Sequence, residues 1–101
     1  MAVVQVSVVP LGTASPSLSR YVAGAWEVLE TAEDLEYQLT PMGTVIEGDL
    51  NRILQVIQQM HENAFGPEVK RVATTIIIDD RRDKKLTMEG KLQSVKAKLS
   101  Q

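Results

Sequence analysis

Hydrophobic and polar residues alternate along the first stretch of the chain, residues 2–10, whose sequence is AVVQVSVVP. A period of two together with many β-branched side chains predicts a strand. The alternating valines should face the core, which leaves Gln5 and Ser7 on the opposite face. Residues 11–17 are rich in Gly, Ser and Thr and predict a loop, with Ser15 as the N-cap of the segment that follows.

Three later stretches carry apolar residues at three- and four-residue steps and predict helices. The first begins at Pro16 and runs to about Thr31. The second follows the N-cap Asp49 and ends near Asn63. Its apolar stripe is the clearest in the chain: Leu50, Ile53, Leu54, Ile57 and Met60. The third begins at about Thr87, and its stripe resembles a coiled-coil seam: Met88, Leu92, Val95 and Leu99.

The middle of the chain predicts a β-hairpin, in which residues 36–40 turn through Pro41-Met42-Gly43 and return as a second strand that ends at Glu47. A proline fixes φ and a glycine accepts a positive φ, so both suit a tight turn. A last strand is predicted over residues 69–79. Its face toward the helices would carry Val72, Thr74, Ile76 and Ile78, and its opposite face Ala73, Thr75 and Ile77.

The order strand, helix, strand, strand, helix, strand predicts an α+β, ferredoxin-like βαββαβ fold. It would have a four-stranded antiparallel sheet of order 4-1-3-2 and an additional C-terminal helix. We expect residues 1–101 to form a single domain with both central helices on one face of the sheet. The other face would carry Gln5, Ser7, Thr75 and Ile77, a mixture too apolar to remain in water, so we expect a homo-oligomer that covers it.

The composition narrows the function without identifying it. The 101 residues are 44% hydrophobic and 24% charged, and a net charge of -2 gives no basic excess for binding nucleic acid or an acidic membrane. The chain has no cysteine, so it has neither a disulfide framework nor a thiolate site. No apolar run approaches the roughly 20 residues of a membrane span, and the N-terminus lacks a signal-peptide pattern. We therefore expect a cytoplasmic protein.

Hydroxyl and carboxylate side chains collect on neighbouring strands of the predicted sheet: Ser7, Thr40, Thr44, Glu47 and Thr75. They could converge on a small polar ligand, because binding pockets place a few hydrogen-bonding groups on an apolar wall. Equally, threonine is favoured in strands, and Glu47 could simply end one. Tyr37 is a candidate for the wall of such a pocket, although core packing is the favoured explanation.

Other polar and aromatic features favour structural roles. The loop from Gly12 to Ser19 could bind an anion at a helix N-terminus, but ordinary capping is the favoured explanation. His61, the sole histidine, has no partner at metal-ligand spacing and is predicted to lie on the surface. Trp26 favours packing or an interface over ligand stacking. The charge run DDRRDKK at 79–85 predicts a salt-bridged turn. We therefore identify no catalytic, metal or cofactor site in the sequence.

Three blocks of the sequence resemble one family: PLG at 10–12, LTPMGTVIEG at 39–48 and TTIIIDDRRD at 74–83. They are similar to the small thiamine-binding proteins of ferredoxin-like fold that were long catalogued as an uncharacterised family. The resemblance covers essentially the whole chain, and the PMGT-x-x-E block is its most specific part. The sequence departs from the family at Ile77, where a lysine is common in relatives, and this makes the open sheet face more apolar.

The resemblance implies a homotetramer, built as a pair of dimers, that binds thiamine or its hydroxymethylpyrimidine part in pockets near subunit interfaces without catalysis. Carried over by position, the PMGT-x-x-E block places Thr44 and Glu47 at the ligand, and the flanking strands place Ser7 and Thr75 there. The aminopyrimidine edge of that ligand offers a donor beside an acceptor, which hydroxyls and the Glu47 carboxylate can match. Tyr37, which the resemblance does not place, completes the predicted ligand-binding set as a wall.

Two other classes of function remain open. Ferredoxin-like domains also serve as small enzymes, such as acylphosphatases, or as regulatory domains that sense another small metabolite. The segment LGTASPSLSR does not closely resemble an acylphosphatase phosphate loop. An RNA-binding domain of this topology needs exposed aromatics on its central strands, where this chain carries Gln5, Ser7, Thr75 and Ile77. Binding of a small molecule without catalysis is therefore the leading hypothesis.

Overall fold

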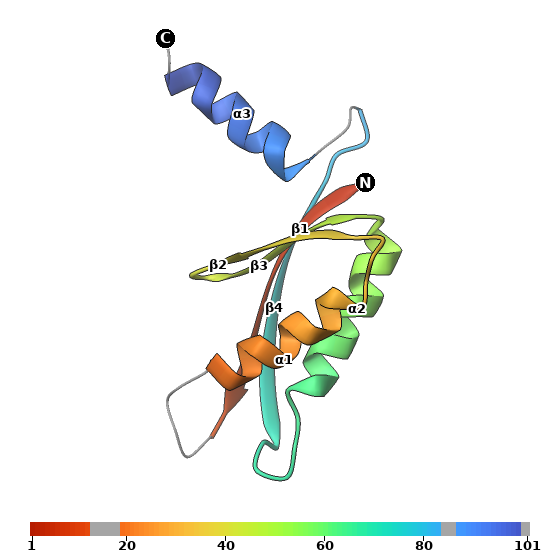
Figure 1. Cartoon of the computed structure of the whole chain (residues 1–101), viewed down its shortest axis with the longest axis vertical. Coiled ribbons are helices and arrows are strands. Elements are labelled where there is room, and N and C mark those ends of the chain that lie inside the picture. The colour runs from red at the N-terminus through yellow and green to blue at the C-terminus, as the bar shows by residue number, and fades with distance from the viewer. Residues whose placement is uncertain (13–18, 84–86, 100–101) are drawn as a thin grey trace.

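A computed structural model describes residues 1–12, 19–83 and 87–99 of the chain (Figure 1). The predicted loop around Ser15 and the start of the first helix at Pro16 lie outside these residues. The elements follow in the predicted order: β1 (Ala2–Leu11), α1 (Ser19–Glu30), β2 (Glu36–Thr40), β3 (Gly43–Gly48), α2 (Leu50–Asn63), β4 (Arg71–Asp80) and α3 (Met88–Leu99).

The four strands form one antiparallel sheet of order β2-β3-β1-β4, which is the predicted order 4-1-3-2 read from the other edge. The α+β ferredoxin-like fold is therefore confirmed. In the register, Val6 lies opposite Thr44 on β3 and opposite Ile76 on β4. Directly opposed residues share a face of the sheet, so these three side chains lie on the same face as Val4. Ser7 and Thr75 are likewise opposed, on the other face.

Helices α1 and α2 pack on the Val4 face and enclose the core (Figure 1). The sheet contributes its alternate apolar residues and the helices contribute one stripe each, as their periodicity predicts. The buried side chains include Val4, Val6, Leu29, Ile46, Ile53 and Val56. We call the opposite side of the sheet the open face. It is defined by Gln5, Ser7, Thr75 and Ile77, and Ile77 is 59% exposed there.

Three details of α2 and β4 differ from the sequence-based expectation. On α2 the buried stripe uses Val56, whereas the predicted Leu54 is exposed. Strand β4 begins two residues later than predicted, because Val69 forms an isolated bridge with Gly66 before the strand starts. Ile76 and Ile78 share the face of the helices but are half exposed, since the helix layer lies mainly over β1 and β3 and covers only part of this edge strand.

Helix α3 lies beyond the end of the sheet, away from α1 and α2 (Figure 1). None of its residues is buried, and Leu92 is 53% exposed, so its apolar stripe does not dock on its own domain. The radius of gyration is 15.2 Å, against about 13 Å for a compact domain of this length. The described part of the chain contains no helix long and apolar enough to cross a membrane.

Candidate functional site

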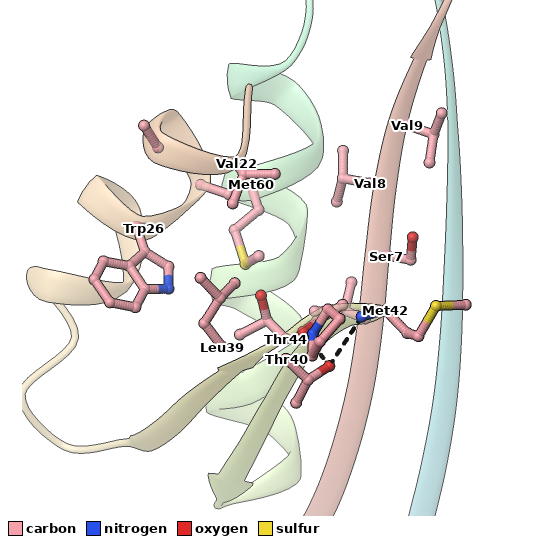
Figure 2. A pocket seen from close by; sticks show the side chains of 15 residues that line it. Ser7, Val8, Val9, Val22, Trp26, Leu39, Thr40, Met42, Thr44 and Met60 are labelled. Atoms are coloured by element: carbon pink, nitrogen blue, oxygen red, sulfur yellow. Dashed lines mark hydrogen bonds between the residues drawn. The ribbon is translucent and has the colours of Figure 1, made fainter. Parts of the chain in front are cut away.

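A pocket of about 560 Å³ lies between α1, the β2–β3 hairpin and the second half of β1 (Figure 2). Its walls are mostly alkyl and aromatic, with three hydroxyl side chains at the hairpin end. Residues that characterise it are Ser7, Val8, Trp26, Thr40, Thr44 and Met60. An apolar cavity of this size with a few placed polar groups is typical of a small-molecule site.

The pocket exists because two neighbouring strands differ in length. Strand β1 has ten residues and β3 has six. Pairing between β1 and β3 ends at Val6–Thr44, whereas pairing between β1 and β4 continues to Leu11–Arg71. The second half of β1 therefore has no neighbouring strand on the hairpin side among the described residues. Side chains of α1 and the hairpin turn border the space that a longer β3 would occupy.

The hydroxyl side chains that line the pocket differ in their hydrogen bonds, exposure and position. Thr40 closes the hairpin turn, because its Oγ1 donates to the carbonyl of Gly43 at 2.8 Å and accepts from the Met42 N–H at 3.3 Å (Figure 2). Thr44 follows on β3 and is only 6% exposed. Ser7 borders the pocket at the edge of β1, but its side chain lies on the open face, on the other side of the strand from Val8 (Figure 2). Thr44 and Ser7 are thus the two predicted ligand-binding residues that line the cavity.

Trp26 forms the wall of the pocket on the α1 side and is 37% exposed. Its ring meets Tyr37 edge-on, with 6.0 Å between the ring centroids and an interplanar angle of 76°. Tyr37 is packed against the core and is absent from the pocket lining. Core packing was the favoured prediction for Tyr37, with the pocket wall as its alternative, and in the structure Trp26 forms the wall while Tyr37 packs against the core and meets the Trp26 ring.

Glu47 lies away from the pocket. It occupies the open face near the end of β3, opposite Val3 in the register. Its Oε2 accepts from the main-chain N–H of Met88 at 2.7 Å, at the first residue of α3. A carboxylate at a helix N-terminus is favourable because it satisfies a free N–H and complements the helix dipole. Within this chain Glu47 therefore caps α3.

Thr75 also lies on the open face and outside the pocket lining. The structure thus places Ser7 and Thr44 at the border of one cavity, on opposite faces of the sheet, while Tyr37, Glu47 and Thr75 lie outside its lining. Sequence periodicity correctly put Ser7 and Thr75 on one face, but alternation along β3 sends Thr44 and Glu47 to opposite faces of the sheet.

His61 is half-buried, so the prediction of a surface histidine is wrong. Its Nδ1 lies 2.6 Å from Oγ1 of Thr74, and its ring meets Phe65 edge-on with 5.3 Å between centroids. The packing of α2 against β4 buries it, which the single-helix pattern did not reveal. Among the described residues no cluster of three His, Cys, Asp or Glu side chains could hold a metal ion.

Charged side chains pair at the surface and not in the pocket. Asp80 binds Arg82 at 3.0 Å, and Arg81 binds Asp83, so the described part of the 79–85 charge run is salt-bridged as predicted. The hydrogen bond to Asp83 raises the pKa of Arg81 above its ordinary value. The described lining of the pocket contains no charged side chain. The site therefore suits an uncharged, partly aromatic group.

Two features of the site were not identified from the sequence: Trp26 as a wall and the uncovered edge of β1. The sequence feature that could have indicated Trp26 is its position beside the apolar stripe of α1, because residues there lie at the edge of the buried face. The signal for the uncovered edge was the longer apolar run of the first strand compared with the returning strand of the hairpin. Neither signal alone locates a pocket, because both depend on how α1 sits over the sheet.

Comparison with known proteins places the chain in a family. A family model described as thiamine-binding protein matches residues 4–96. The UPF0045 protein YqgV of Bacillus subtilis is 50% identical over 98 residues, which cover 94% of each chain. The crystal structure of the hypothetical protein MJ1052 from Methanocaldococcus jannaschii has a TM-score of 0.85 at 39% identity, covering 93% of this chain and 94% of that chain.

The fold recurs at lower identity. A Thermotoga maritima protein proposed to act in thiamine biosynthesis or salvage has a TM-score of 0.74 at 21% identity, covering 93% of this chain and 97% of that chain. This likeness concerns the fold alone. The family model, in contrast, matches nearly the whole sequence, and the Bacillus protein is 50% identical to it. These two matches show family membership as well as a common fold. On these grounds the chain belongs to the thiamine-binding protein family.

Proposed function

We propose that this protein binds thiamine, or its hydroxymethylpyrimidine part, in the pocket between α1 and the hairpin. The observation that carries the proposal is the cavity itself, with the side chain of Thr44 on a mostly apolar wall and Ser7 at its β1 edge, in a chain of the thiamine-binding family. Its volume of about 560 Å³ falls within the range of roughly 300–1,000 Å³ for small-molecule sites.

Binding would take place without turnover. General acid–base catalysis needs a titratable side chain within hydrogen-bond reach of the reacting group. The described lining offers hydroxyl, alkyl, thioether and indole groups, and no carboxylate, amine or imidazole. These groups can hold and orient a ligand. The cysteine-free sequence is in keeping with the cytoplasmic location that we propose.

The pocket would lie at an interface between subunits of a homo-oligomer, which we propose to be a tetramer. Its mouth is bordered by apolar side chains that are exposed in the single chain: Val22, Trp26, Leu39 and Met42. Exposed apolar groups that gather in one place mark interaction sites. The other predicted ligand contacts, Glu47, Thr75 and Tyr37, lie outside the lining of this pocket, so we expect none of them to touch a ligand bound there. In such an assembly Glu47 and Thr75, on the open face, would meet a neighbouring copy.

A pair of identical substitutions distinguishes the pocket from the open face. Thr44→Val and Thr75→Val each remove one hydroxyl and keep the shape of the side chain, one inside the cavity and one on the open face. A neutral hydrogen bond contributes about 0.5–1.5 kcal/mol. We expect calorimetry with thiamine to show about two- to tenfold weaker binding for Thr44→Val.

In the same titrations Thr75→Val should keep the wild-type affinity. Weakening by Thr75→Val alone would place the ligand on the open face and contradict the pocket proposal. Circular dichroism and thermal unfolding of both variants control for changes in the fold.

A further inference from the structure

We propose that the main chain of β1 at Val8 recognises the ligand, by pairing with the edge of an aminopyrimidine ring. The Val8 N–H would donate to a ring nitrogen, and the Val8 carbonyl would accept from the adjacent amino group. This inference rests on the proposed function, because it concerns the same pocket. It assigns specificity to main-chain groups, in place of the carboxylate of Glu47, which caps α3.

The direction of the Val8 groups follows from the hairpin. A Cβ built on Gly43 would lie 2.7 Å from the carbonyl oxygen of Val6, so this carbonyl points toward the hairpin. In an antiparallel strand the N–H and C=O of one residue point to the same side, and the side alternates from residue to residue. Val8, two residues later, therefore directs both groups to the hairpin side.

The hairpin ends before it reaches Val8. The last residue of β1 opposed by β3 is Val6, and no other described strand follows on that side. Val8 itself lines the pocket (Figure 2). A buried donor or acceptor on such an edge is costly unless a partner satisfies it. A bound ligand can be that partner.

Pro10 is independent support for an unpaired edge. It lies within β1 and, by the same alternation, its nitrogen faces the hairpin side. Proline cannot donate to a ladder, so within sheets it occupies positions whose nitrogen faces an unpaired side. Strand β1 is central in the sheet at its beginning and becomes an edge strand toward its end.

The main-chain N–H and C=O of Val8 complement the aminopyrimidine half of thiamine, and not its thiazolium half. In 4-aminopyrimidines a ring nitrogen that accepts lies beside an amino group that donates. This pattern complements an N–H and a C=O that are adjacent along an extended strand. Across the cavity, Trp26 offers an aromatic wall for a flat ring. The cationic thiazolium has no such partner in the uncharged described lining, and its burial there would be costly.

The first test uses wild-type protein and four probes in calorimetric titrations. These are thiamine, 4-amino-5-hydroxymethyl-2-methylpyrimidine, its 4-oxo analogue and an N-methylated thiazolium alcohol. We expect the aminopyrimidine to bind within about tenfold of thiamine. The 4-oxo analogue reverses the donor and acceptor and should bind at least tenfold more weakly than the aminopyrimidine. The thiazolium alcohol should not bind measurably.

The second test changes the edge itself. Val8→Pro removes the N–H on the hairpin side and leaves the ladder with β4, whereas Val8→Ala shortens the side chain and keeps both main-chain groups. We expect at least tenfold weaker aminopyrimidine binding for Val8→Pro and less than threefold for Val8→Ala. If Val8→Pro does not fold, the comparison of the amino and oxo probes decides.

The outcomes separate this inference from the proposed function. Binding of thiamine with equal affinities for the amino and oxo probes would overturn recognition by the β1 edge and leave thiamine binding intact. Tight binding of thiamine and of the thiazolium alcohol, without binding of the aminopyrimidine, would have the same consequence. Failure of all four probes to bind would overturn both proposals together.

Discussion

Gly43 determines where the hairpin turns and therefore where the pocket begins. Its φ of +151° is unfavourable for residues with a side chain, and a Cβ at this position would lie 2.7 Å from the main-chain carbonyl oxygen of Val6. The obstacle is main chain on a central strand, which cannot move aside. The sequence indicated the turn through Pro41 and Gly43, but the contact with Val6 depends on the register between β1 and β3.

Gly43→Ala should destabilise the protein by about 1–3 kcal/mol, since it combines backbone strain with a steric clash. Gly66→Ala is the matched control, because nothing lies within 4 Å of its added Cβ. Chemical denaturation measures both. Equal stabilities of the two variants would show that the hairpin accommodates a side chain at residue 43 without cost.

The strands and helices of this protein were largely predictable, and the pocket between them was not. Periods of two and of three to four fix which residues share a face, and the order of elements leaves few topologies. Those rules located β1, α2 and the antiparallel sheet. They do not specify where β3 stops pairing with β1, nor that Trp26 and Tyr37 meet edge-on. Both features depend on how α1 is placed over the sheet. The hydrophobic periodicity of a single strand or helix does not contain that information.

Helix α3 is held mainly at its first turn. The Glu47 carboxylate accepts from the Met88 N–H at 2.7 Å, and Lys91 lies 2.6 Å from Asp79 at the end of β4. Its stripe of apolar residues touches little of its own chain. The position of α3 therefore depends on polar contacts with the end of the sheet, and less on packing.

Glu47→Ala should loosen the start of α3, because the helix loses a charge-assisted hydrogen bond to a free N–H. Half-exposed contacts of this kind contribute about 1–2 kcal/mol. Hydrogen exchange should show faster exchange at Met88 and the following turn. Glu36→Ala is the control, since Glu36 is the exposed neighbour of Glu47 across the β2–β3 pair. Unchanged exchange in Glu47→Ala would contradict the capping role.

Besides the apolar mouth of the pocket, the described part of the chain leaves two further apolar surfaces exposed. One is the open face of the sheet around Ile77, and the other is the α3 stripe that includes Leu92. The outline of the chain is elongated, 51 Å by 29 Å by 19 Å. Homo-oligomers bury such surfaces symmetrically, which is the physical reason for the proposed assembly.

Ile77→Glu should shift the protein toward smaller species in sedimentation experiments, because a carboxylate at the centre of the open face would have to be buried without a partner. Leu54→Glu introduces the same group at another exposed aliphatic position, on α2, and should leave the assembly unchanged. The open face would lose its proposed role if both variants sedimented like the wild type.

The central claim is that thiamine occupies the cavity between α1 and β1, and Trp26 reports on it directly. It is the single tryptophan in the chain and it lines the pocket. We predict a saturable change in its emission as thiamine is added, with the same midpoint as the heat of binding measured by calorimetry. Binding heat without any change in Trp26 emission would put the ligand elsewhere on the protein. The absence of both signals would show that this chain does not bind thiamine.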